Sequence, residues 1–158
     1  MNRAHDIYAE TNPAYCAAVL AQFCASHNEH RGRAPALAVA YLVLPIVLSE
    51  DLAQTFDKCV KSMGLLVWLD RSPRIRVGLS GRVNATLPVS TEAIRFGCIA
   101  GLLRLEGEGT IASSHRKLPA AVSSGVAGPA LKRARLLGSW FAEAGSARAV
   151  MEAMGVSV

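Results

Sequence analysis

The side chains that can do chemistry are scattered along this chain. His27, Glu29 and His30 fall in one polar stretch, HNEHRGRA at residues 27–34. A histidine beside a carboxylate can transfer protons or help to hold a metal ion. The sequence places neither a nucleophile nor a third ligand beside this stretch. We therefore interpret these residues as part of a solvated loop.

The cysteines and the other histidines also lack the spacing of a metal site. No two cysteines form a CxxC pair, and no histidine falls at ligand spacing from them. The cysteines are Cys16, Cys24, Cys59 and Cys98, and the remaining histidines are His5 and His115. We expect buried thiols in a reducing compartment. The motifs GxSxG, GxxxxGK[ST], GxGxxG and HExxH are absent too, so the sequence predicts neither a cofactor nor an enzyme.

Basic side chains are the second candidate group. The formal net charge is +5, which permits contact with phosphates but is not concentrated in a run. The candidate phosphate contacts are Arg71, Arg74, Arg82, Lys132 and Arg135. Either they form a solvated basic surface, or they contact phosphates or an acidic partner.

The C-terminal residues 130–158 offer candidate protein contacts. They predict a long helix that stops at Gly145 and a short helix that Ser146 caps and Gly155 ends. One face of the long helix can close the core, whereas Leu136 and Trp140 lie on a second apolar face. The candidate interface residues are Leu136, Trp140, Met151 and Met154. Packing of Trp140 inside this chain is the alternative.

Overall composition also favours a partner. Hydrophobic residues make up 51% of the 158 residues and charged residues only 18%, so some apolar surface is expected to be covered by another protein. The N-terminus shows no signal-peptide pattern. The apolar run 34–48 is too short and too broken by prolines to span a bilayer. We expect a cytoplasmic protein without membrane contact.

The N-terminal part, residues 12–61, is expected to be helical. Asn12-Pro13 is a strong helix start, and the apolar pattern continues to about Asn28. Residues 36–48 fit either a buried helix that ends or kinks before Pro45 or a buried strand. A further helix is predicted from residue 49 to about residue 61.

Residues 62–113 predict three helices followed by a hairpin, which is the order of a winged helix. The helices are expected over 63–70, from Pro73, and from residue 90 to about residue 103, with Pro88 as a break. The hairpin is LRLEGEGTIAS at residues 103–113. Its tip carries Glu106 and Glu108, which would repel a phosphate backbone. We therefore interpret the module as one that docks to protein, with a DNA-binding regulator that also uses Arg95 as the alternative.

The predicted fold is mainly α. It is a compact helical domain over residues 1–158, with the winged-helix-like module in its middle, a loop at 114–128 and a C-terminal helical pair at 129–158.

Several short motifs in this order resemble the middle components of three-component ABC ATPase systems (ABC-3C systems, including the Lamassu type). The motifs are Asn12-Pro13, Leu42-Val43-Leu44-Pro45, Thr91-Glu92-Ala93, Phe96-Gly97, Gly101-Leu102-Leu103, Leu137-Gly138-Ser139-Trp140-Phe141-Ala142 and Met154-Gly155-Val156. Their order and the Leu-Gly-x-Trp-Phe and Gly-Val pieces carry the resemblance.

The resemblance implies an adaptor between an ABC ATPase of the SMC and Rad50 type and an effector, often a nuclease. Such systems are implicated in bacterial defence against phage or plasmid DNA. The adaptor would have no catalytic residues of its own, and contact with DNA is possible through the complex.

Overall fold

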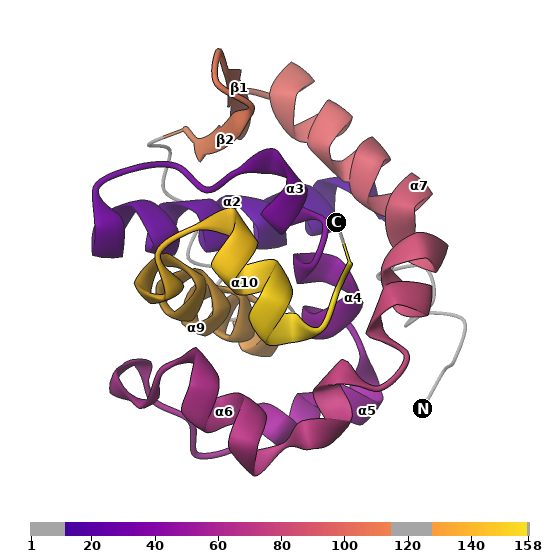
Figure 1. The fold of residues 1–158 in the computed structure, drawn as a ribbon. Coiled ribbons are helices and arrows are strands. Elements are labelled where there is room, and N and C mark those ends of the chain that lie inside the picture. Colours follow the sequence, from indigo (N-terminus) through magenta and orange to yellow (C-terminus); the bar gives the residue numbers. More distant parts are fainter. Residues whose placement is uncertain (1–11, 115–127, 158) are drawn as a thin grey trace.

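The computed structural model describes residues 12–114 and 128–157, and it is mainly helical, as predicted (Figure 1). Residues 1–11 and most of the predicted 114–128 loop, and with them His5 and His115, lie outside the described residues. The elements are α2 (Pro13–Arg31), α3 (Leu37–Ala40), α4 (Val43–Val47), α5 (Glu50–Ala53), η1 (Gln54–Phe56), η2 (Lys61–Met63), α6 (Leu65–Arg71), η3 (Pro73–Arg76), α7 (Leu79–Ile99), β1 (Leu103–Glu106), β2 (Thr110–Ser113), α9 (Gly128–Ala144) and α10 (Ala147–Met154).

The first described helix begins where the sequence predicts. The side chain of Asn12 accepts hydrogen bonds from the backbone nitrogens of Ala14 at 2.9 Å and Tyr15 at 3.4 Å, which satisfies donors that the first turn leaves free. The helix continues past Asn28 to Arg31 and ends at Gly32, whose φ is +73°. The polar stretch at 27–34 is therefore partly helical and not a loop throughout.

The centre of the fold is the crossing of α2 and α9, which pack along each other. Gly138 of α9 lies against the backbone of α2, where a Cβ atom would collide with the carbonyl oxygen of Phe23 and approach the nitrogen of His27 to 3.1 Å. The Ser26 hydroxyl donates to the Arg135 carbonyl at 2.6 Å across the same contact. The C-terminal helix thus closes the core, as its sequence pattern predicts.

Residues 36–48 form two short helices, α3 and α4, so the strand alternative is wrong. Pro45 does not end the helix but lies in the first turn of α4. The N–H groups of a first turn have no partner within the helix, so a proline costs no hydrogen bond there. The next helix, α5, ends at Ala53, and the short 3-10 helix η1 follows it to Phe56. The helical segment therefore stops well before the predicted end near residue 61.

The predicted break at Pro88 is wrong, because α7 runs without interruption through it. The missing N–H of Pro88 frees the carbonyl of Asn84, and both residues are exposed, so water can reach that carbonyl. Leu79 on one side of the proline and Ile94 on the other are buried, which anchors both halves of α7. A short helix, a 3-10 turn, one long helix and the hairpin therefore replace the separate helices of a winged helix.

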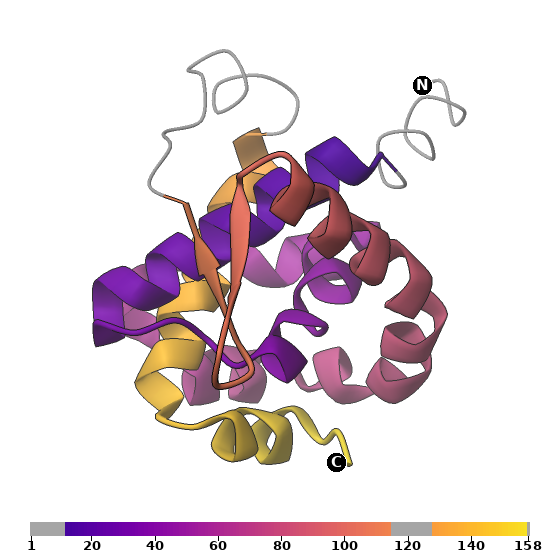
Figure 2. The ribbon, with the colours of Figure 1, turned by 90° about the horizontal axis from the view of Figure 1, so that it is seen from above.

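The hairpin forms as predicted, with Leu103 opposite Ser113 and Glu106 opposite Thr110. Figure 2 shows it crossing α2. The Leu103 side chain packs so tightly on Gly97 that a Cβ there would lie 2.6 Å from its Cδ1 atom. Gly101 turns the chain after α7 with a φ of +76°.

Three arginine side chains donate to carbonyl groups near helix C-termini. Arg31 bonds the carbonyl of Ala142 in α9 at 3.0 Å, and Arg133 bonds that of Val47 in α4 at 3.0 Å. Arg76 bonds that of Ala153 in α10 at 2.7 Å. Such carbonyls lack partners within the helix and carry the negative end of its dipole. Part of the positive charge of the chain is thus used to join its own helices.

The tight crossing at Gly138 makes a testable prediction. Gly138→Ala should lower the free energy of unfolding by about 2 kcal/mol, because the added methyl group overpacks two backbones. Urea denaturation followed by circular dichroism measures the change.

Gly81 is the matched control, since it lies in α7 with nothing within 4 Å of a Cβ placed there. Gly81→Ala should raise the free energy of unfolding by about 0.5–1 kcal/mol through helix propensity. Similar effects of the two substitutions would contradict the close crossing.

Candidate functional site

The candidate acid–base residues His27, Glu29 and His30 are each engaged within the fold, and the Nδ1 atom of His30 lies 3.5 Å from the Oγ atom of Ser139. His27 is buried in the last turns of α2, and its Nδ1 donates to the carbonyl of Arg33 at 3.0 Å. The prediction of a solvated His27 is therefore wrong. Burial lowers the pKa of His27; its hydrogen bond to Arg33 opposes this shift, and the charges of Arg31, Arg33 and His30 add to it. Glu29 is engaged with Arg135 at 2.9 Å.

Cys16 and Cys24 are buried in α2, as the sequence predicts. Cys59 and Cys98 are only half-buried. Burial raises the pKa of Cys24 to about 12, so its sulfur stays protonated at neutral pH. In residues 12–114 and 128–157, no three His, Cys, Asp or Glu side chains are grouped so that they could hold a metal ion.

The candidate phosphate contacts lie on α6, η3, α7 and α9, and two of them are engaged in ion pairs within the chain. Arg82 of α7 pairs with Asp51 and also donates to Ser49 at 2.8 Å. Hydrogen bonds from Arg82 and then Ser49 hold the pKa of Asp51 well below its usual range, and the same pair raises the pKa of Arg82. Arg135 of α9 pairs with Glu29 of α2.

The other candidate cations are more exposed and lie on different elements. Arg71 ends α6, Arg74 lies in η3, and Lys132 lies in the first half of α9; all three are exposed. Arg95 of α7 pairs with Glu92 at 2.7 Å. Three of the candidate cations, Arg82, Arg95 and Arg135, are thus paired with carboxylates of this chain, which reduces the charge they can offer to a phosphate backbone.

The four candidate interface residues are mostly inside the molecule. Trp140 and Met154 are fully buried and Met151 is nearly so, whereas Leu136 is half-buried against the core. Of the two interpretations of Trp140 that the sequence leaves open, packing inside this chain is the one that the structure shows. The second apolar face of α9 is covered by η1, η2 and α6, and not by another protein.

The cover over Trp140 is an aromatic cluster that was not predicted from the sequence. The ring of Trp140 stacks on Phe56 with centroids 6.1 Å apart and meets Trp68 at 5.2 Å. Both indole nitrogens are satisfied, since Trp140 donates to the carbonyl of Lys61 at 3.2 Å and Trp68 to that of Thr55 at 3.1 Å. The cluster joins α6 and η1 to α9.

The spacing of the apolar residues in α6 could have indicated this cluster. Leu65, Trp68 and Leu69 are spaced as one helix face, and all three are buried. Leu66 lies on a different side of the helix and is 65% exposed.

Beside the aromatic cluster, the surface opens into an apolar groove between α6, α9 and α10, with a volume of about 330 Å³. Trp140 forms part of its bottom. Its other lining residues are Met63, Gly64, Leu65, Leu66, Val67, Glu143, Ala144, Ala149 and Ala153. Among the described residues that line it, only Glu143 is charged. Trp140 is the one predicted interface residue that lines the groove, whereas Leu136, Met151 and Met154 do not line it.

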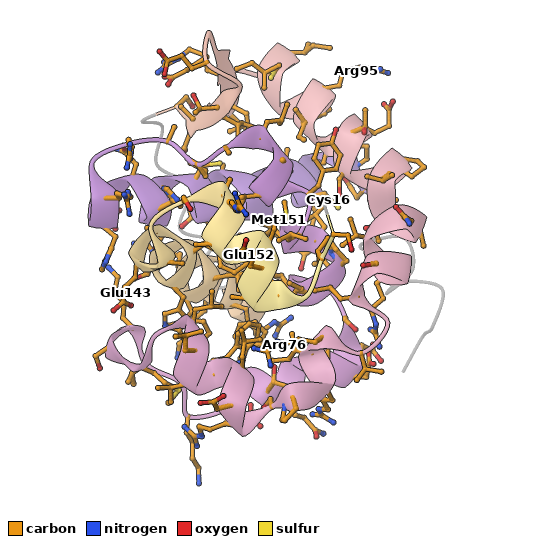
Figure 3. All side chains as sticks on the ribbon, in the orientation of Figure 1. Cys16, Arg76, Arg95, Glu143, Met151 and Glu152 are labelled. Carbon is orange, nitrogen blue, oxygen red and sulfur yellow. The ribbon has the colours of Figure 1, made fainter. Side chains whose placement is uncertain are left out.

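A second apolar surface lies at the C-terminal end of α7 and on β1, and it is named the α7–β1 surface here. It consists of the exposed side chains of Phe96, Ile99 and Leu105, of which Ile99 is 83% exposed. Figure 1 shows α6 and the end of α7 at opposite ends of the molecule. In Figure 3, Glu143 marks the groove and Arg95 marks the α7–β1 end.

None of the described helices is by itself long and apolar enough to cross a membrane. One pair, Leu37–Val47 with Glu50–Phe56, passes that test only when joined across a 92° bend.

A family model matches the whole chain, residues 1–158, and is described as "ABC-three component (ABC-3C) system Middle Component 3". The chain therefore belongs to this family of ABC-3C middle components, as its motifs indicate. Neither a curated protein nor a solved structure matches it.

The burial of Trp140 predicts a large effect on stability. Trp140→Ala should lower the free energy of unfolding by about 4 kcal/mol, because it empties a packed aromatic site. The exposed Leu66 is the control, and Leu66→Ala should change the free energy by less than about 0.5 kcal/mol. Urea titrations of both variants measure these changes. A Trp140→Ala protein as stable as the wild type would contradict the core role of Trp140.

His27 predicts a pH dependence. Its folded pKa lies below the unfolded value of about 6.5, so the unfolded chain binds more protons as the pH falls through that value. The free energy of unfolding should therefore rise between pH 5 and pH 7.5, and His27→Gln should reduce this rise. Urea titrations across that range test it; an unchanged pH dependence in the variant would contradict the assignment.

Proposed function

We propose that this chain is a non-catalytic adaptor that links an SMC/Rad50-like ABC ATPase to an effector, often a nuclease. The complex would act in the cytoplasm of bacteria against phage or plasmid DNA. A middle component implies further components of the same system, and the family match covers the whole chain.

The observation that carries the adaptor role is the presence of two separated apolar surfaces. An adaptor must hold two partners at once, so it needs two contact areas that do not overlap. The groove between α6, α9 and α10 and the α7–β1 surface lie at opposite ends of the fold (Figure 1). Exposed apolar side chains are common at protein interfaces.

The state of the candidate reactive groups supports a binding role. His27 is buried and bonded to a backbone carbonyl, and the thiol of Cys24 is held protonated by burial. The arginines Arg82 and Arg135 are engaged with Asp51 and Glu29. The complex as a whole, and not this chain alone, would then be the DNA-contacting unit.

Co-expression with the ATPase and effector components tests the proposal. A tag on this chain should recover both components. The Ile99→Glu variant should recover only one of the two components, because the substitution places a charge on the α7–β1 surface only. Its melting temperature should stay within about 2 °C of the wild type, since an exposed side chain is changed.

Two results would contradict the adaptor role. One is a well-folded chain that recovers neither component. The other is binding of the isolated chain to duplex DNA that weakens steeply with salt, which would favour a DNA-binding regulator.

A further inference from the structure

We infer that the groove between α6, α9 and α10 binds an amphipathic helix of a partner protein, with apolar side chains on one face and a lysine or arginine beside Glu143. This inference rests on the proposed adaptor function and names the chemistry of one partner.

The groove is built to receive apolar side chains. Leu66 and Val67 are exposed on α6, and the small residues Ala149 and Ala153 lie one helical turn apart on α10. Small residues at this spacing leave a hollow into which side chains of another helix can insert. The bottom is firm, because Trp140 is held there by ring contacts and by its bond to the Lys61 carbonyl.

The occupant must satisfy its own backbone hydrogen bonds. The groove is lined by residues of the helices η2, α6, α9 and α10 and by the N-cap residue Gly64. It contains no strand edge among the described residues, so an added strand would find no ladder of backbone partners there. A helix bonds its own backbone internally, and it is the form of chain that fits an apolar groove of this kind.

The charge at one end of the groove defines the polar part of the partner. Glu143 is exposed on α9, on the side that faces α6 (Figure 3). The ion pairs that the described residues form involve other carboxylates, namely those of Glu29, Asp51, Glu92, Glu106 and Glu152. A partner cation beside Glu143 would complement this charge and fix the direction in which the helix lies.

The first test measures binding of the purified ATPase and effector components, each to this chain, by biolayer interferometry. Leu66→Glu should weaken the binding of one component by at least about tenfold, because it charges the apolar rim. Val77→Glu is the matched control, since Val77 is 71% exposed and does not line the groove. It should change the affinity by less than about twofold.

The second test addresses charge and shape. Glu143→Lys should weaken the binding of the same component several-fold at low salt, and this loss of affinity should become smaller as salt is added. A photo-crosslinking amino acid in place of Val67 should attach to one peptide of that component. That peptide should carry apolar residues at i, i+3 or i+4 and i+7 together with a lysine or arginine.

The outcomes separate the two levels of the proposal. Binding of neither component by the wild type contradicts the adaptor role, and the groove assignment falls with it. If the wild type binds but Leu66→Glu and Val77→Glu change the affinity equally, only the groove assignment is overturned. A crosslink to a second copy of this chain, or to a peptide without helical apolar spacing, overturns it as well.

Discussion

The fold depends on the contact between the backbones of α2 and α9 at Gly138. The absence of a side chain there lets α9 approach the carbonyl of Phe23 closely, and the Ser26 bond to the Arg135 carbonyl fixes the same crossing. The two helices come from opposite ends of the chain. This crossing brings Phe23 and Phe141 into an edge contact with centroids 5.8 Å apart, and the remaining elements pack around it.

Two further kinds of contact extend this centre outward. The aromatic cluster of Phe56, Trp68 and Trp140 attaches α6 and η1 to the other face of α9. Arginine side chains attach other helix ends, as in the bond from Arg76 to the carbonyl of Ala153. Aromatic packing and charge-assisted bonds to helix termini are both strong when partly shielded from water. The core is thereby closed on both faces of α9.

This closure separates the buried apolar residues from those available to partners. Trp140 is used inside the chain, while Leu66 and Val67 next to it remain exposed on the outer side of α6. Ile99 is exposed in the same way at the far end of α7. The proposed adaptor function depends on these exposed groups, because each lies on a helix whose other face is already packed. Partners can therefore bind without opening the core.

The sequence alone determined the start of α2, the ends of α9 and α10, the hairpin and the family, because these depend on short local patterns. Asn12 caps its own first turn, and Gly155 ends α10 within a few residues. Tertiary structure decided what each apolar face meets. Trp140 was placed in the core by residues far away in the chain, and Pro88 stays in α7 because buried residues on both sides of it hold the helix together. Such contacts join distant residues, so a local pattern contains no record of them.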